Sequence, residues 1–155
     1  MGKPHRFRVL DVDVDVIPFV PLESADRSIT WSNDHRMTVV GFSEAMAVAE
    51  DLQLPSGRSV AVASLPSQVV PKLFAWRDRR AESTKDAIDL RSIILSYSEG
   101  SHFDQLYNEH FHRVSRQGYD AQRAGAGTLA AEMGGVIATN RMLLNALATG
   151  MRDHS

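Results

Sequence analysis

RVLDVDVDVIPF, residues 8–19, alternates acidic and apolar side chains without interruption from Asp11 to Val16. A β-strand places successive side chains on opposite faces, whereas a helix would scatter these carboxylates around its circumference. The period therefore predicts a strand in which Asp11, Asp13 and Asp15 share one face. The valines at 12, 14 and 16 share the other face, and we expect that face to join the core. Two prolines follow closely, which places the strand at an edge of its sheet or at its exit.

The acidic face of this strand supports two interpretations. Carboxylates two residues apart on a strand lie roughly 7 Å from each other. They repel by about 2–2.5 kcal/mol at an effective dielectric of about 20, but by less than about 1 kcal/mol in open water. A hydrated face is the ordinary case for a sheet with one wet side. The alternative is a partly buried face that binds a cation through Asp13 and Asp15. Magnesium is the ion that best suits carboxylate oxygens combined with substrate phosphate.

The composition is that of an ordinary globular chain. Among 155 residues, 43% are hydrophobic and 23% are charged, which suffices for one domain with a real core. The net charge of −2 provides no basic field for nucleic acid or a membrane surface. The absence of cysteine excludes disulfides, thiolate metal sites and cysteine nucleophiles. No stretch has the length of a membrane span, and the polar N-terminus lacks a signal-peptide pattern, so we expect a cytoplasmic protein without a membrane partner.

The pattern along the chain predicts a single α+β domain over residues 1–155. Residues 1–65 form a small sheet with one short helix: strands are expected at 37–42 and 59–63 besides the acidic one, with the helix over 45–50. Residues 66–150 form a helical half. Its helices are expected to begin after Ser64, with a bend at Pro71, and to continue over 85–97, 103–111, 119–132 and 136–148. Gly134 and Gly135 separate the last two.

Three patterns suggest chemistry but have simpler structural explanations. Residues 125–130 imitate part of a glycine-rich dinucleotide loop, but they lie inside a helical pattern rather than after a strand, so close helix packing explains them. The histidines at 102, 110 and 112 lack zinc-type spacing, and a surface role accounts for them. The basic run at 77–80 is too short for a nucleic-acid patch and is typical of a hydrated helix end.

Several segments taken together resemble the predicted bacterial nucleotidyltransferases of the abortive-infection toxin type. They are VDVIPF at 14–19, MTVVGFSEA at 37–45, LPSG at 54–57, VASLP at 62–66, KLFAWRDRR at 72–80, KDAIDL at 85–90, and the tail around Tyr119, Asp120 and 124–126. The similarity runs over roughly residues 6–147. Its most specific part is the order and spacing of Lys72 and the KDAIDL block.

The resemblance implies a polymerase-β-like nucleotidyltransferase fold. Three carboxylates in that fold hold two Mg²⁺ ions, which align a nucleoside triphosphate for in-line attack by an acceptor. Asp15 matches the third carboxylate, with Asp13 beside it as a further metal ligand, and Lys72 matches the catalytic lysine near the triphosphate. The residues assigned to nucleotide binding are Lys72, Arg77, Arg80 and Lys85. Asp86 and Asp89 match a later acidic motif that is expected to orient Lys72 or an arginine.

One part of the family pattern is expected to be missing. The Gly-Ser motif and the Asp-x-Asp pair belong several dozen residues before the position of Asp15, and Asp11 and Asp13 cannot replace them because they share a strand with Asp15. The resemblance therefore implies a partial nucleotidyltransferase-like mixed sheet followed by a helical C-terminal half. It also implies magnesium-dependent nucleotide transfer, to a protein or an RNA, that is impaired in this chain.

Two alternatives stay open. The first is a non-catalytic module that binds a nucleotide or a partner protein, as in a toxin–antitoxin system. The second is an intact enzyme whose chain start was assigned too far downstream. A sheet that lacks its first strands exposes an unpaired edge, which is a template for strand pairing, so we expect the chain to form a homo-oligomer.

Overall fold

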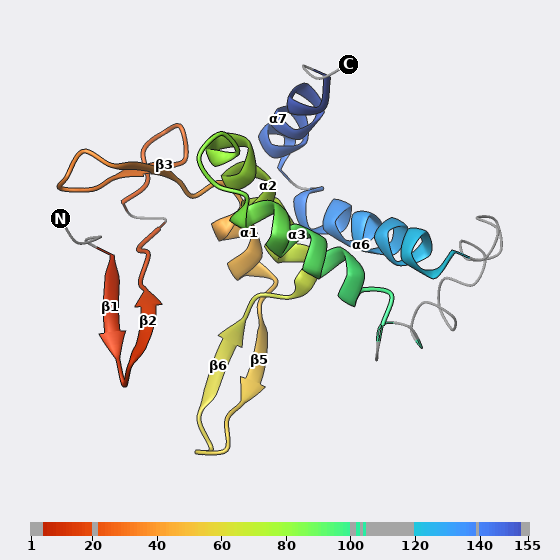
Figure 1. The fold of residues 1–155 in the computed structure, drawn as a ribbon, viewed down its shortest axis with the longest axis horizontal. Helices are drawn as coiled ribbons and strands as arrows, with labels where there is room; N and C mark the ends of the chain where they lie inside the picture. Colours follow the sequence, from red (N-terminus) through yellow and green to blue (C-terminus); the bar gives the residue numbers. More distant parts are fainter. Residues whose placement is uncertain are drawn as a thin grey trace.

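A computed structural model describes residues 5–19, 22–99, 102, 104, 120–138 and 140–152. This part of the chain is α+β, with antiparallel hairpins attached to a helical body (Figure 1). The strands are β1 (Arg6–Val9), β2 (Val12–Asp15), β3 (Ser28–Thr30), β4 (Arg36–Thr38), β5 (Glu50–Gln53) and β6 (Ser59–Val62). The helices are α1 (Phe42–Ala47), α2 (Leu65–Arg79), α3 (Lys85–Ser96), α6 (Ala121–Ile137) and α7 (Arg141–Arg152).

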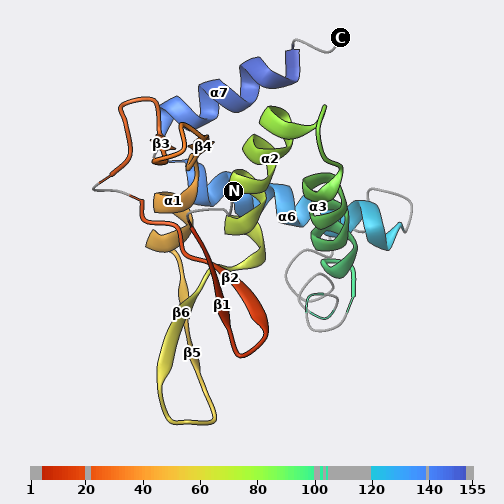
Figure 2. The same cartoon turned by 60° about the vertical axis from the view of Figure 1, so that its left-hand side comes forward.

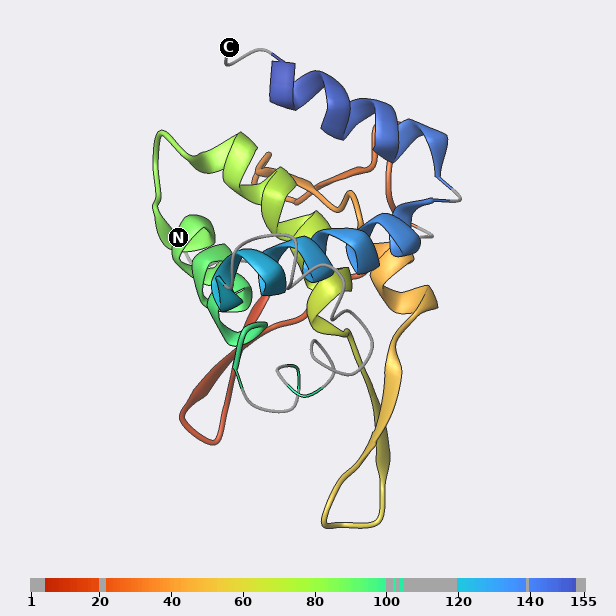
Figure 3. The ribbon, with the colours of Figure 1, turned by 90° about the vertical axis from the view of Figure 1, so that its right-hand side faces the viewer.

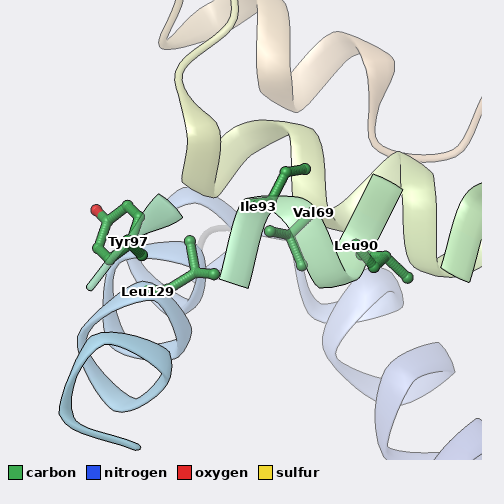
Figure 4. Packing of buried hydrophobic residues seen from close by; sticks show 5 residues of the cluster. All are labelled: Val69, Leu90, Ile93, Tyr97 and Leu129. Carbon is green, nitrogen blue, oxygen red and sulfur yellow. The ribbon is translucent and has the colours of Figure 1, made fainter. Parts of the chain in front are cut away.

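Helix α2 joins the two apolar clusters of the helical body. The first cluster consists of Val69, Leu90, Ile93, Tyr97 and Leu129, from α2, α3 with its C-terminal cap, and α6 (Figure 4). The second consists of Val70, Phe74, Ile137 and Leu143, from α2, α6 and α7. The consecutive residues Val69 and Val70 therefore belong to different clusters, and other helices pack on two sides of α2 (Figure 3). Each fully buried aliphatic or aromatic side chain contributes roughly 1.5–3 kcal/mol, so these clusters hold the helical body together.

The hairpins β1–β2 and β5–β6 project from the helical body (Figures 1 and 2). Every residue of their four strands is exposed. The prediction that Val12, Val14 and Val16 join the core is therefore wrong, since they are 62%, 38% and 55% exposed. Alternation gives the strand its two faces, but a face is buried only when a second layer covers it.

The expectation of one mixed sheet also differs from the structure. Strands in the described ranges pair only as three separate two-stranded antiparallel sheets, β1–β2, β3–β4 and β5–β6. Each pair is local, because a short turn joins its two strands. The hairpin predicted around Pro55–Gly57 is confirmed as β5–β6, and its turn includes Gly57 at φ 79°.

The connection from β4 to α1 covers residues 39–41 and lies earlier in the chain than predicted. Strand β4 ends at Thr38 rather than at 42, and α1 begins at Phe42 rather than at 45, with Gly41 as its N-cap. Gly41 has a φ of 90°, which turns the chain directly into the helix. The preceding Val39 is fully buried, so core packing holds this turn close to the helical body.

Helix α6 runs without interruption through Gly134 and Gly135, where the sequence predicted a break. Each glycine costs roughly 1 kcal/mol in a helix, but Met133 and Ile137 on either side pack into the core and outweigh that cost. The actual break follows Ile137, and Asn140 then caps α7 by accepting from the backbone N–H groups of Met142 and Leu143. The predicted helix over 103–111 lies outside the described residues, apart from an isolated position at 104.

Gly125 has the packing role that the sequence predicted. A Cβ at this position of α6 would lie 3.0 Å from the backbone nitrogen of Ser98 and 3.1 Å from the carbonyl of Tyr97. We therefore expect Gly125→Ala to lower the free energy of unfolding by about 1 kcal/mol, because overpacking against rigid backbone exceeds the gain in helix propensity. Gly135→Ala, which meets no atom of the described structure within 4 Å, should raise the free energy of unfolding by about 0.5–1 kcal/mol. Urea denaturation of both variants checks the difference in sign.

Candidate functional site

The charged face of the β1–β2 hairpin pairs arginines with aspartates across the two strands. Arg6 lies opposite Asp15, and Arg8 lies opposite Asp13. The Arg6 guanidinium donates to both oxygens of Asp15, at 2.7 and 2.8 Å, and Arg8 donates to Asp13 at 3.5 Å. The hydrogen bond to Asp15 is the main cause that raises the pKa of Arg6 above its ordinary value. Each candidate metal ligand therefore already has a counter-charge within the hairpin.

Asp11 lies outside strand β2, which begins at Val12, so the strand is shorter than the alternation predicted. Asp11 lies in the two-residue turn between β1 and β2, with a φ of 64°, after Leu10 with a φ of 47°. Positive φ at both turn positions is typical of a type I′ turn, whose twist matches that of the flanking strands. Asp13 and Asp15 are therefore the aspartates paired in the strand register, while the Asp11 carboxylate lies 3.5 Å from the Arg8 guanidinium from its place in the turn.

Asp13 and Asp15 do not by themselves form a site that suits magnesium. Mg²⁺ requires near-octahedral coordination by oxygen atoms, whereas these carboxylates accept from guanidinium groups. The described ranges contain no cluster of three or more histidine, aspartate or glutamate side chains that could hold a metal ion. A magnesium ion at this hairpin would therefore need further ligands, such as the phosphate oxygens of a nucleotide.

The second group of predicted site residues meets between α2 and α3. Asp86, in the first turn of α3, is only 2% exposed. Arg79 of α2 donates to both of its oxygens, at 2.7 and 2.9 Å, and the Lys72 ammonium lies 3.8 Å from one of them. Lys72 also donates to Asp89, one turn further along α3. We name Lys72, Arg79, Asp86 and Asp89 the α2–α3 charge cluster.

Lys72 is oriented by this cluster but stays accessible. Its side chain is 32% exposed, and that of Arg79 is 48% exposed. The hydrogen bond from Lys72 lowers the pKa of Asp89, against a smaller opposing effect of burial, so this carboxyl stays ionised at neutral pH. The cluster thus presents two cations from fixed positions on α2, both partly in solvent.

The remaining predicted nucleotide-binding residues are distributed around this cluster. The positive charge of Lys85 helps to lower the pKa of Asp89. Arg77 lies over the ring of Phe74, 4.7 Å from its centroid, and Arg80 lies over the ring of Trp76 at 5.7 Å. Guanidinium groups stacked on aromatic faces keep their charge while losing rotamer freedom. The C-terminal half of α2 therefore carries several cations whose positions are restricted.

Sequence reasoning missed the role of Arg79. It was assigned to a hydrated helix end, although it lies seven residues after Lys72 and hence on the same side of α2. That spacing, read together with the acidic motif of α3, was the available signal. The predicted contact between the acidic motif and Lys72 or an arginine is present, and it involves both.

Sequence reasoning also missed a network around Arg27. This arginine donates to Glu23 at 3.1 Å and to Glu44 of α1 at 3.3 Å, and all three side chains are 12–16% exposed. Asn140 donates to Glu44 at 2.7 Å. The network joins the approach to β3, the start of α1 and the start of α7, so its role is structural.

A shallow apolar groove lies on one side of the α2–α3 contact. It has a volume of about 300 Å³. Its lining consists of Leu73, Trp76, Ala87, Leu90, Arg91, Ile94 and Leu95. Trp76 lines this groove, and the guanidinium of Arg80 lies over its ring. The groove places an aromatic ring close to the cations of α2.

Comparison with family models, curated proteins and solved structures finds no match for this chain. Among the described helices, none has both the length and the apolar character needed to cross a membrane.

Proposed function

We propose that this chain is a nucleotidyltransferase-type protein that binds a magnesium-bound nucleoside triphosphate at the α2–α3 charge cluster. The observation that carries the proposal is the arrangement of Lys72 and Arg79, held by Asp86 and Asp89 yet partly exposed. The order of these residues also underlies the resemblance noted in the sequence. Transfer of the nucleotide by this chain is proposed to be impaired, because Asp13 and Asp15 are paired with arginines.

Phosphate chemistry suits this arrangement. Charge-assisted hydrogen bonds from lysine and arginine to phosphate oxygens are among the strongest that proteins form. Fixing the cations in advance reduces the side-chain entropy that binding would otherwise cost. Magnesium would arrive with the phosphates, since it prefers phosphate oxygen combined with a few carboxylates. The groove beside Trp76 offers an apolar surface on which the base of the nucleotide can stack.

The test is a calorimetric titration of the chain with magnesium and each of the four nucleoside triphosphates. Wild-type protein is expected to bind at least one of them. Lys72→Met should weaken that binding at least about tenfold, since a charge-assisted hydrogen bond contributes about 1.5–3 kcal/mol. Asp89→Asn should leave binding unchanged or tighter, because it releases the Lys72 ammonium toward the phosphates.

The matched control is Arg123→Met. It removes the same positive charge from a side chain that is 78% exposed at the start of α6. Its binding constant should equal that of the wild type. Absence of binding to all four triphosphates would overturn the proposal, as would an equal loss in Arg123→Met and Lys72→Met.

A non-catalytic nucleotide- or partner-binding module is the second candidate function. The arginine pairing of Asp13 and Asp15 favours it, because carboxylates bound to guanidinium groups are less available to a metal ion. Incubation with α-labelled triphosphates separates the two candidates. Label that enters protein or RNA, and is lost in Asp15→Ala, identifies an enzyme; binding without incorporation identifies the module.

A further inference from the structure

Trp76 links the α2–α3 charge cluster to the groove beside it. It follows Lys72 by four residues and precedes Arg79 by three, so the three side chains lie along one side of α2. Trp76 also lines the groove and packs against the first apolar cluster. Core contacts therefore hold the indole at the groove, between the two cations that we assign to phosphate binding.

The groove has the size and the lining of a site for one planar ring system. Its volume of about 300 Å³ is at the lower end of the range for small-molecule pockets, which is roughly 300–1,000 Å³. Among the described residues that line it, Arg91 alone is charged, and all the others except Trp76 are aliphatic. A base in this groove is therefore selected mainly by the area that it stacks, since the lining offers few groups for hydrogen bonds.

We propose that this site selects purine nucleotides, because the base stacks on the indole of Trp76. This preference rests on the proposed function, since it requires the phosphates to lie at Lys72 and Arg79. Stacking on aromatic side chains needs no hydrogen-bond pattern, and preferences among bases then follow stacking strength. A purine has two fused rings, as indole does, and covers more of the indole than the single ring of a pyrimidine. Adenine and guanine are therefore both preferred over cytosine and uracil.

Arg80 is the positioning residue for this ring. It is the C-cap of α2, and its guanidinium carbon lies 5.7 Å from the centroid of the Trp76 ring. A planar guanidinium over an aromatic ring is attracted by the ring and restricts its rotation. An indole that is already restricted loses less entropy when a base stacks on it. Arg80 thus acts on the base through Trp76 rather than on the phosphates.

Calorimetric titration with each of the four nucleoside triphosphates and with inorganic tripolyphosphate, all in magnesium, tests the preference. The two purine triphosphates should bind at least about threefold more tightly than the two pyrimidine triphosphates. Trp76→Leu keeps an apolar side chain in the groove, and it should weaken purine binding at least about fivefold and remove the preference. Its affinity for tripolyphosphate should equal that of the wild type, which shows that the variant is folded. Trp76→Phe, a smaller change, should keep purine binding but reduce the preference.

Trp31→Leu is the matched control. Trp31 is the second of the two tryptophans in the sequence, and it contacts the ring of His5, with the ring centroids 4.9 Å apart, instead of the groove. Its binding constants should equal those of the wild type. Because Trp76 is the one tryptophan left in this variant, a purine triphosphate should quench its fluorescence, whereas tripolyphosphate should not.

Arg80→Lys tests the positioning role, because it keeps the positive charge but removes the planar guanidinium. It should weaken purine binding about threefold and leave tripolyphosphate binding unchanged. A loss of tripolyphosphate binding in Arg80→Lys would instead assign Arg80 to the phosphates and overturn its positioning role.

The outcomes separate this preference from the proposed function. Equal affinity for all four triphosphates, unchanged purine binding in Trp76→Leu, or a purine triphosphate that binds Trp31→Leu without quenching would overturn the purine preference. The proposed function would still stand in those cases if Lys72→Met weakens binding of the triphosphates. Absence of binding to every triphosphate would overturn both.

Discussion

Replacing Arg27 by alanine is expected to lower the free energy of unfolding by about 3 kcal/mol, as for breaking a buried ion pair. Arg27 bridges Glu23 and Glu44, and these three side chains are only 12–16% exposed. Without the guanidinium, two largely buried carboxylates lose their counter-charge. Glu44 keeps the hydrogen bond from Asn140, which does not neutralise it. Arginine and alanine have a similar backbone cost at the positive φ of 60° found here, so the loss of stability measures the removal of the guanidinium.

The loss in Arg27→Ala should also depend on pH. Burial by itself would raise the pKa of Glu44, but hydrogen bonds from Arg27 and Asn140 outweigh it and hold the pKa below the ordinary 4.5. A carboxyl with a depressed folded pKa stabilises the protein above its unfolded pKa, and that contribution is lost as pH falls through the folded pKa. In the variant, burial is less opposed, the pKa of Glu44 rises, and protonation relieves the unpaired charge. The stability difference from wild type should therefore narrow as pH falls through the raised pKa of Glu44 in the variant and then through its depressed pKa in the wild type.

Urea denaturation at neutral and acidic pH measures both effects. Arg36→Ala is the matched control, because Arg36 pairs with Asp26 at the surface, where the two side chains are 63% and 52% exposed. Exposed ion pairs contribute less than about 1 kcal/mol, so this variant should stay close to wild type. Equal losses in the two variants, or a loss in Arg27→Ala that does not change with pH, would contradict the role assigned to the network.

Replacing Gly41 by alanine is expected to cost about 2–4 kcal/mol, from backbone strain combined with overpacking. Gly41 has a φ of 90°, which residues other than glycine rarely adopt. A Cβ there would lie 2.8 Å from Cγ1 of Val70 and 3.0 Å from the ring Cδ and backbone nitrogen of Pro71. Val70 is fully buried and the Pro71 nitrogen belongs to the backbone of α2, so neither can move aside at low cost.

Gly57→Ala separates the two contributions. Gly57 has a similar φ of 79° in the β5–β6 turn, and an added Cβ meets no atom of the described structure within 4 Å. It should therefore show the backbone cost alone, about 1–2 kcal/mol. The difference between the two variants in thermal or urea denaturation measures the close approach of the chain to α2. Equal losses would show that steric contact at Gly41 contributes nothing.

Part of the candidate site follows from the order of residues. The family resemblance implied that Asp86 and Asp89 orient Lys72 or an arginine, and in the structure α3 places both carboxylates against Lys72 of α2. The pairing of Arg79 with Asp86 was not predicted, because it depends on how α2 and α3 cross. The pairing of Asp13 and Asp15 with arginines was not predicted either, because the register of the hairpin depends on its turn at Leu10 and Asp11.

Local elements could be read from the amino-acid sequence because their causes are local. The alternation over residues 11–16 predicts β2, the turn at 55–57 predicts β5–β6, and apolar spacing predicts α2 and α3. These elements suffice for the α+β class. Their signals are periodicity and turn chemistry, which act over a few neighbouring residues.

Burial, by contrast, was decided by the tertiary structure. The valines of β2 face solvent because no described element covers them, whereas α6 continues through two glycines because core contacts on both sides outweigh the cost. The bond between Glu44 and Asn140 joins residues 96 positions apart, which no local pattern encodes. Whether an apolar face is buried, and which charge meets which, depends on the partner surface, and that surface exists only once distant parts of the chain have come together.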